Sequence, residues 1–323
     1  MTEGRQLRTL GQTGMRVSAI GLGLAALGRP GYINIGHGED LHGRTDVASM
    51  ERNAHRVLDA AFAGGVRYLD AARSYGRAEA FLASWLERRR LQPSDVTVGS
   101  KWGYTYTAGW RVDAAQPEVK DLSVATLRRQ LTESRALLGP HLRLYQVHSA
   151  TLESAVLDDA AVLEELARLR EEGLAIGVSV TGPGQAETLL RVLETGAFDT
   201  VQATWNLVER SAGPALAEAH AAGLGVIVKE ALANGRLTDR GHNTLLTATA
   251  GEEGATPDAL ALAAVLAKPW ADVVLSGATT TDQLRRNLAA FDVDYAEELD
   301  DRLLPLSEKP AEYWSTRSGL AWN

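Results

Sequence analysis

The chain has 323 residues, of which 45% are hydrophobic and 23% charged; it has no cysteine and a formal net charge of −8. This composition excludes a disordered or collagen-like chain, and the missing cysteines exclude disulfides, thiolate metal sites and cysteine nucleophiles. The negative charge argues against a nucleic-acid partner, and the lack of a run of ~18 apolar residues argues against a membrane span. Because the first residues also lack an apolar signal core, we expect a cytoplasmic protein. No linker interrupts the chain, so we expect one domain over residues 1–323.

Short apolar runs alternate with longer segments along the whole chain. Each run ends in a polar residue or glycine, which is typical of strands buried on both faces of a parallel sheet. Eight strands are predicted, at residues 18–23, 66–70, 96–101, 142–148, 174–179, 200–204, 225–229 and 272–276.

The segments between these runs have the periodicity of helices. One begins Thr256-Pro257, a capping residue followed by proline at the first helical position, and runs over 257–266. Others are expected near 214–222 and 281–290. Eight strands alternating with eight helices predict a (β/α)8 TIM barrel, and an open doubly wound sheet is the alternative. Residues 7–10 and 15–17 predict an N-terminal β-hairpin that caps the bottom of the barrel.

Two connections are longer than simple turns, at residues 28–49 and 102–121. Loops of this length in a compact domain are usually functional or disordered. The second predicts a packed lid over a pocket; the alternative is packing against a neighbouring loop. The aromatic side chains on which this prediction depends are Trp102, Tyr104, Tyr106 and Trp110.

Titratable residues stand where three of the predicted strands end. These are Asp70, Lys101 and His148, and Tyr75 follows in the loop after Asp70. Side chains at the carboxyl ends of barrel strands point into the active-site mouth, so we expect the four to converge. Only five of the 33 basic residues are lysines, yet Lys101 and Lys229 both fall at predicted strand ends.

The segments that carry these four residues resemble the Asp–Tyr–Lys–His tetrad of the aldo-keto reductases. They are residues 69–76, 99–101 and 144–148, and further matching segments at 10–23, 177–179, 201–207 and 276–288 follow the family's order. The resemblance implies a NAD(P)H-dependent oxidoreductase that reduces an aldehyde or ketone to an alcohol. It makes Tyr75 the proton donor and implies that Lys101, held by Asp70, lowers the pKa of the phenol. It assigns His148 to orientation of the substrate oxygen.

The resemblance also implies a site for the nicotinamide cofactor. Ser179 and Gln202 would meet the nicotinamide carboxamide, and the free N–H groups at the start of the last core helix would suit a phosphate. The adenosine end would lie over Gly277, Thr279, Gln283 and Asn287. The other residues expected at the cofactor are Lys229, Glu230, Leu232 and Arg286.

Three positions depart from the family's pattern. Val180 replaces an asparagine that holds the carboxamide, with Thr181 as a substitute. Lys229 replaces an aromatic ring, and either pairs with Glu230 or binds an anion of the cofactor or substrate. Thr279 replaces a basic residue that grips the 2′-phosphate of NADP(H), so that Arg285 or Arg286 would have to reach it. We expect NADP(H), with NAD(H) left open.

Other functions remain open from the sequence. The same tetrad serves an NAD-dependent aldose dehydrogenase working in the oxidative direction, or a nicotinamide-binding regulatory subunit with little turnover. An unrelated metal-dependent hydrolase would need a cluster of histidines and carboxylates, and no metal site is predicted. The expected partner is a small carbonyl substrate, apolar or ring-bearing. The tail 313–323 folds over the pocket, packs on the barrel or meets a partner, and no oligomeric state is assigned.

Overall fold

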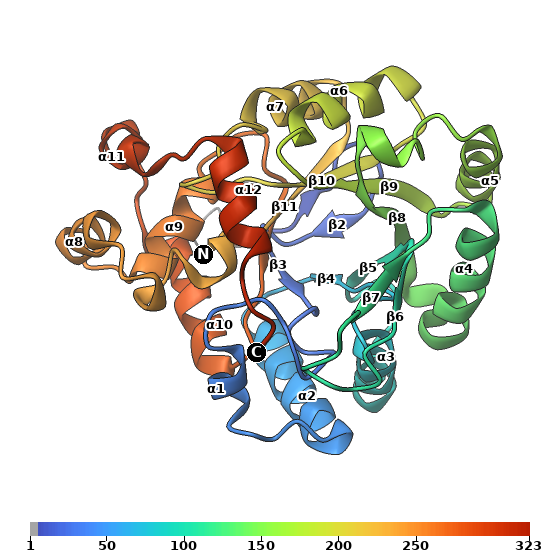
Figure 1. The fold of residues 1–323 in the computed structure, drawn as a ribbon, viewed down its shortest axis with the longest axis horizontal. Helices are drawn as coiled ribbons and strands as arrows, with labels where there is room; N and C mark the ends of the chain where they lie inside the picture. Colours follow the sequence, from blue (N-terminus) through green and yellow to red (C-terminus); the bar gives the residue numbers. More distant parts are fainter. Residues whose placement is uncertain (1–5) are drawn as a thin grey trace.

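Eight parallel strands form a closed barrel with helices around it, in a computed structural model that describes residues 6–323 (Figure 1). The last barrel strand pairs with the first, which confirms the predicted TIM barrel. Two strands have the predicted bounds, and the others differ by one or two residues at an end. The barrel strands are β3 (Ile20–Gly23), β4 (Tyr68–Asp70), β5 (Thr97–Trp102), β8 (Leu142–Ala150), β9 (Ala175–Val180), β10 (Thr200–Thr204), β11 (Gly225–Lys229) and β12 (Val273–Ser276).

An antiparallel hairpin closes the bottom of the barrel, as predicted. Its strands are β1 (Arg8–Thr9) and β2 (Arg16–Val17), and Leu10 packs into the cluster of buried residues that fills this end. The turn presses against the start of β11: a Cβ on Gly11 would lie 2.2 Å from the Gly225 amide nitrogen, and Gly11 has a φ of +49°. Only glycine combines that approach with that backbone conformation without strain.

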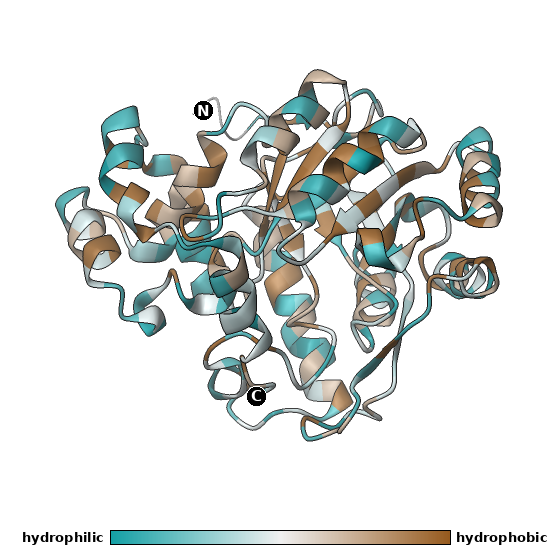
Figure 2. Cartoon of the chain, turned by 45° about the horizontal axis from the view of Figure 1, so that its top comes forward, coloured by the Kyte–Doolittle hydropathy of each residue, from teal (hydrophilic) through white to brown (hydrophobic). Residues whose placement is uncertain are grey.

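One helix follows each barrel strand and packs its apolar side inward. In Figure 2 the central strands are mostly brown, whereas the outward helix surfaces carry much of the teal. The barrel helices are α2 (Val47–Ala63), α3 (Ala78–Arg89), α4 (Val124–Leu138), α5 (Ala160–Glu171), α6 (Gln185–Thr195), α7 (Gly213–Ala221), α9 (Pro257–Leu266) and α10 (Thr281–Leu288). Within residues 6–323, four more α-helices lie outside this pattern: α1 (His37–Leu41), α8 (Thr244–Glu252), α11 (Glu297–Leu303) and α12 (Pro310–Ser318). Among the helices of residues 6–323, none combines the length and apolar character needed to cross a membrane.

The second long connection contains a hairpin of β6 (Tyr104–Tyr106) and β7 (Glu118–Lys120). Its aromatic residues do not form one lid. Trp102 is fully buried in the core, and Trp110 packs edge-on against Phe81 at 6.2 Å. Of the four aromatic residues, only Tyr104 lines the main cavity. The expectation of an aromatic lid is therefore wrong for Trp102, Tyr106 and Trp110.

The tail returns across the top of the barrel to the first long connection (Figure 1). The backbones of Asn323 and Tyr32 exchange two hydrogen bonds, Asn323 N–H to Tyr32 O at 3.1 Å and Tyr32 N–H to Asn323 O at 3.2 Å. Trp322 and Arg317 line the cavity. Of the three expected positions, the tail therefore takes the one over the pocket. The prediction that residues 1–323 form one domain stays a prediction, because residues 1–5 lie outside the described part.

Candidate active site

A cavity of about 610 Å³ opens at the carboxyl ends of the barrel strands. Three members of the predicted tetrad line it: Asp70, Tyr75 and His148. Lys101 lies directly behind them and is 1% exposed. The four residues thus meet as the sequence predicts, from the ends of β4, β5 and β8 and from the loop after β4.

Lys101 links Asp70 to Tyr75 within the tetrad. Its ammonium forms a buried ion pair with Asp70 and donates to the Ala71 carbonyl oxygen at 3.1 Å. The same nitrogen lies 3.5 Å from the Tyr75 hydroxyl oxygen. Removing either partner of such a buried pair leaves an uncompensated charge, which costs roughly 3–5 kcal/mol.

The second Asp70 oxygen is held from three sides. Oδ2 accepts from Gln202 Nε2 at 2.9 Å, from the Tyr68 hydroxyl at 3.2 Å and from Gln146 Nε2 at 3.4 Å. These donors fix the carboxylate, and with it the position of the Lys101 ammonium. Gln202 therefore belongs to the tetrad's support as well as to the cavity lining.

The Tyr75 phenol is held in its protonated form. Burial raises its pKa, and the nearby Asp70 carboxylate raises it further. Removal of the phenol from water outweighs the positive charges near it, and the expectation that Lys101 lowers the pKa of Tyr75 stays a prediction. A phenol that keeps its proton at neutral pH is suited to donate it.

His148 is a neutral imidazole. Burial lowers its pKa well below the usual value, and the positive charges of Lys101, Lys229 and Arg29 lower it further. Its ring packs edge-on against those of Tyr75 at 5.5 Å and Tyr104 at 5.0 Å. Nδ1 has no hydrogen-bond partner within residues 6–323. The ring thus sits beside the phenol and can donate one hydrogen bond to a ligand oxygen.

The two residues expected at the nicotinamide differ in access. Gln202 lines the cavity, but Ser179 does not; its hydroxyl accepts from the Ser149 backbone N–H at 3.0 Å. Ser149 has a φ of +58°, a conformation that a non-glycine residue rarely adopts. Ser179 therefore supports the backbone next to His148. Thr181, the expected substitute beside Val180, does line the cavity.

The start of α10 lies at another part of the same cavity, which Gly277, Thr279, Gln283, Arg286 and Asn287 line together with Leu232. The backbone N–H groups at the start of α10 are less available to a ligand than the sequence predicted. The Gln283 side-chain oxygen accepts from the N–H groups of Thr279 at 2.8 Å and Thr280 at 3.2 Å, and the Thr280 hydroxyl accepts from the Gln283 N–H at 3.2 Å. This capping box occupies amides that a phosphate was expected to use.

Lys229 and Glu230 do not form the ion pair that one expectation allowed. Glu230 has a φ of +55°, which ends the regular strand, and its carboxylate pairs with Arg317 of α12. Burial alone would raise the pKa of Glu230, but the Arg317 and Lys229 charges lower it to about 2. Lys229 makes neither a hydrogen bond nor an ion pair in the described chain; its ammonium lies 5.8 Å from the centre of the Trp314 ring, and burial lowers its pKa to about 8. The cavity therefore contains a half-buried, unpaired ammonium.

Sequence reasoning missed the side chains that the first long connection and the tail contribute. Arg29 is 3% exposed and pairs with Glu118 of β7. Its guanidinium carbon lies 4.5 Å from the centre of the Trp322 ring and 5.3 Å from that of Tyr75. The length of the connection and the aromatic tail were the available signals, but neither shows which residue reaches the phenol.

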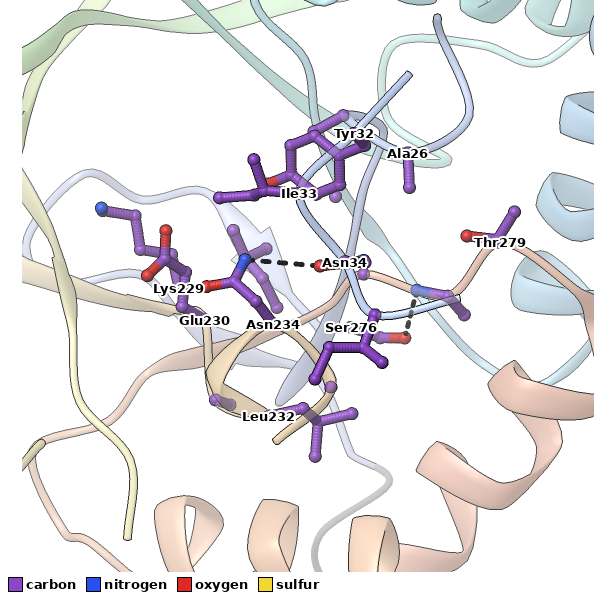
Figure 3. Close-up of a pocket in the computed structure, with 18 of the residues that line it drawn as sticks. Ala26, Tyr32, Ile33, Asn34, Lys229, Glu230, Leu232, Asn234, Ser276 and Thr279 are labelled. Atoms are coloured by element: carbon purple, nitrogen blue, oxygen red, sulfur yellow. Dashed lines mark hydrogen bonds between the residues drawn. The ribbon is translucent and has the colours of Figure 1, made fainter. Parts of the chain in front are cut away.

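Two loops meet across the cavity. Asn234 Nδ2 donates to Asn34 Oδ1 at 3.3 Å, and the Ile35 N–H donates to the Asn234 carbonyl oxygen at 3.0 Å. Figure 3 shows this contact between Lys229 on one side and Thr279 on the other. An ion pair between Arg240 and Asp40 ties the same loops together. The contact between these two loops thus separates the polar residues near Lys229 from those near Thr279.

Comparison with known proteins gives the family. The chain matches the profile of the Aldo/keto reductase family over residues 19–302. It is 23% identical to "Uncharacterized oxidoreductase YqkF" of Bacillus subtilis, across 96% of this chain and 99% of that protein. It is 25% identical to "L-galactose dehydrogenase" of Arabidopsis thaliana, across 88% of each.

A solved structure agrees in fold. The "aldo-keto reductase AKR11C1 from Bacillus halodurans (holo form)" aligns with a TM-score of 0.73 at 22% identity, covering 94% of this chain and 97% of that one. The profile match spans most of the chain and includes all four tetrad positions. The chain therefore belongs to the aldo/keto reductase family and is an oxidoreductase of that family.

Proposed function

We propose that this chain reduces an aldehyde or ketone to an alcohol with a nicotinamide cofactor and with Tyr75 as the proton donor. The observation that carries the proposal is the contact of Tyr75 with Lys101 and His148 at the floor of one cavity. A protonated phenol, a neutral imidazole and a buried ammonium at one point are the groups that carbonyl reduction needs.

Each member of the tetrad has a separate role in the reaction. The cofactor, when bound, supplies the hydride. His148 donates a hydrogen bond to the carbonyl oxygen and orients it, and Tyr75 gives that oxygen its proton. The Lys101 ammonium, 3.5 Å from the phenol oxygen, stabilises the phenolate that remains. Asp70 acts through Lys101, which it holds in position.

The residues present fit a dinucleotide. The unpaired Lys229 ammonium suits the pyrophosphate, and Gly277, Thr279, Gln283, Arg286, Asn287 and Leu232 line the space for the adenosine end. Gln202 donates to Asp70, and its side-chain oxygen accepts no hydrogen bond within the described chain, so it is available to the nicotinamide carboxamide. Glu230 lines the cavity and pairs with Arg317, whereas Ser179 acts indirectly, through Ser149. NADP(H) and NAD(H) are equivalent at the tetrad, since they differ only at the adenosine ribose.

The substrate end is more polar than expected. It contains the ion pairs Arg29–Glu118 and Arg317–Glu230 as well as the rings of Tyr104 and Trp322. A purely apolar carbonyl compound would displace water from these charged groups without replacing its hydrogen bonds, so we propose a small substrate that carries hydroxyl or charged groups beside the carbonyl.

A second candidate is the same chemistry in the oxidative direction, as an NAD-dependent aldose dehydrogenase. The polar substrate end and the similarity to a protein named L-galactose dehydrogenase favour it. A regulatory subunit with little turnover fits less well, because the complete tetrad is assembled. The unrelated hydrolase is excluded by the family, and no group of three or more potential metal ligands occurs within residues 6–323. A cytoplasmic location stays a prediction.

Turnover assays test the proposal directly. Oxidation of NADH or NADPH should be followed with a panel of hydroxylated, acidic and aromatic aldehydes and ketones, and reduction of NAD⁺ or NADP⁺ with aldoses. The proposal expects turnover in at least one direction that disappears in Tyr75→Phe. If every active substrate is turned over equally well by Tyr75→Phe, the role of Tyr75 is wrong.

A further inference from the structure

The cavity surface around α10 is rich in hydrogen-bond acceptors. Asp40 of α1 accepts three hydrogen bonds there: from Arg240 Nη1 at 2.9 Å, from Arg240 Nη2 at 2.5 Å and from Gln283 Nε2 at 2.7 Å. Both residues that contact it also line the cavity. Arg240 is therefore already neutralised by a carboxylate, and one of the two N–H donors of the Gln283 side chain is occupied.

Asp258, near the start of α9, adds a second carboxylate to this surface. It is 2% exposed, and its Oδ2 accepts from Arg286 Nε at 3.2 Å. Its other oxygen, Oδ1, is buried and has no donor among residues 6–323. A buried carboxylate oxygen without a donor is costly. A ligand that brings a hydroxyl or amino donor to this place would remove that cost.

Thr279 lines the same cavity and supplies neither a cation nor a free backbone N–H group. It is 2% exposed, and its N–H donates to Gln283. Its carbonyl oxygen accepts from Asn53 Nδ2 at 2.8 Å, and its hydroxyl lies 3.3 Å from Nδ1 of the buried His37. Burial lowers the pKa of His37 to about 4, so this imidazole is neutral at pH 7 and supplies no positive charge.

We infer that this end of the cavity takes the adenosine ribose of NAD(H), with its free 2′-hydroxyl, in preference to the 2′-phosphorylated ribose of NADP(H). The inference rests on the proposed function, because the tetrad must meet the nicotinamide and leaves the α10 end to the adenosine. It reverses the expectation of NADP(H). A ribose hydroxyl donates to carboxylates, whereas a phosphate only accepts.

The two basic residues of this surface do not change that preference. A 2′-phosphate at Arg240 or Arg286 would lie close to Asp40 or Asp258, the carboxylates with which these guanidinium groups already pair. Repulsion between the phosphate dianion and the carboxylate would offset the attraction of the arginine. Lys229, whose ammonium forms no ion pair within residues 6–323, is separated from Thr279 by the Asn34–Asn234 contact (Figure 3). It therefore does not discriminate between the two cofactors.

Isothermal titration calorimetry of the full chain with NADH and NADPH, at matched pH and ionic strength, tests the inference. We expect the Kd of NADH to be lower by about tenfold or more, as loss of one charge-assisted contact would produce. Asp258→Asn removes a carboxylate and frees Arg286. It should therefore lower the Kd of NADPH and bring the ratio of the NADPH and NADH Kd values closer to one. Thr279→Arg supplies a cation and should lower that Kd independently. Asp282→Asn is the matched control: it removes the same charge from an exposed ion pair on α10 and should leave the ratio unchanged.

The outcomes separate the inference from the proposed function. Equal constants, or tighter binding of NADPH to the wild type, overturn the inference and leave the function standing. Failure of both cofactors to bind overturns both. Thermal unfolding of each variant shows whether it is folded. If one of Thr279→Arg and Asp258→Asn does not fold, the other still tests the inference.

Discussion

The Lys101 ammonium lies 3.5 Å from the Tyr75 hydroxyl oxygen while it is paired with Asp70. It therefore reaches the phenol from the buried side, and the open side of the ring remains for the substrate. Burial raises the pKa of Tyr75, so the cation matters most when the phenol loses its proton. Two predictions separate the proton donor from the charge that assists it.

Tyr75→Phe should lower kcat by roughly 10²–10⁴-fold, which is the usual contribution of general acid catalysis, and should leave the Kd of the cofactor unchanged. The reason is that this substitution removes only the hydroxyl that carries the proton. Single-turnover kinetics and equilibrium binding give the two quantities. Tyr106→Phe is the control, because Tyr106 does not line the cavity. A Tyr75→Phe enzyme with more than about a tenth of the wild-type rate would remove Tyr75 from the acid role.

Lys101→Met should change the pH dependence of the oxidative reaction as well as its rate. Oxidation requires the phenolate, so the rate rises with pH, and loss of the neighbouring ammonium should move the midpoint of that rise upward by about one unit or more. The pH–rate profile of the variant measures this, with the exposed Lys309→Met as control. If the rate falls and the midpoint stays in place, Lys101 has a structural role only.

Lys229→Ala should raise the Kd of the cofactor by about tenfold or more, since the unpaired ammonium loses a charge-assisted contact with a phosphate. Lys268→Ala is the matched control, because Lys268 pairs with Asp300 outside the cavity. Both constants should be measured at the same ionic strength. Equal Kd values for Lys229→Ala and wild type would reject the cofactor contact and leave a substrate anion as the partner.

The same lysine predicts how affinity depends on pH. The pKa of Lys229 is lowered to about 8, so the ammonium is charged below that pH and the contact is lost as the pH rises through it. Cofactor affinity of the wild type should therefore fall in alkaline solution, while that of Lys229→Ala should stay flat over the same range. Parallel curves for the two proteins would show that another group controls binding.

Arg317→Met should destabilise the fold, because it leaves Glu230 as an uncompensated buried charge. The pKa of Glu230 is lowered from 4.5 to about 2, which corresponds to about 3 kcal/mol of stability. That stability is present above pH 4.5 and is lost as the pH falls toward 2, so acid should remove the difference between variant and wild type. Urea unfolding at neutral and acid pH measures it. Arg285→Met, in an exposed pair with Asp282, should cost little, and an equal cost for both variants would contradict the prediction.

The barrel and the tetrad could be predicted because they depend on local patterns. Buried parallel strands show as apolar runs, and the residue at the end of each run points to the mouth whatever the surrounding loops do. Asp70, Lys101 and His148 were found in this way, and Tyr75 through the family motif. The hairpin under the barrel was equally local, since its glycines mark the turn.

The walls of the cavity could not be predicted, because they depend on contacts between distant segments. Arg29 meets Trp322 only because Asn323 bonds to Tyr32, which is 291 residues earlier in the chain. Glu230 was one of two expected partners of Lys229, but its φ of +55° turns it toward Arg317. Ser179 and the amides of α10 were assigned to ligand contacts, and the structure uses them for Ser149 and Gln283 instead.

Fluorescence titration of the purified protein with NADH and NADPH tests whether the cavity binds a nicotinamide dinucleotide. Trp322 lines the cavity and stacks on Arg29, so a dinucleotide bound there should change its emission. We expect saturable quenching with one site per chain, at lower concentrations of NADH than of NADPH, and displacement by the oxidised cofactor. No saturable change with either dinucleotide up to about 1 mM, the upper range of substrate constants for enzymes, would contradict it.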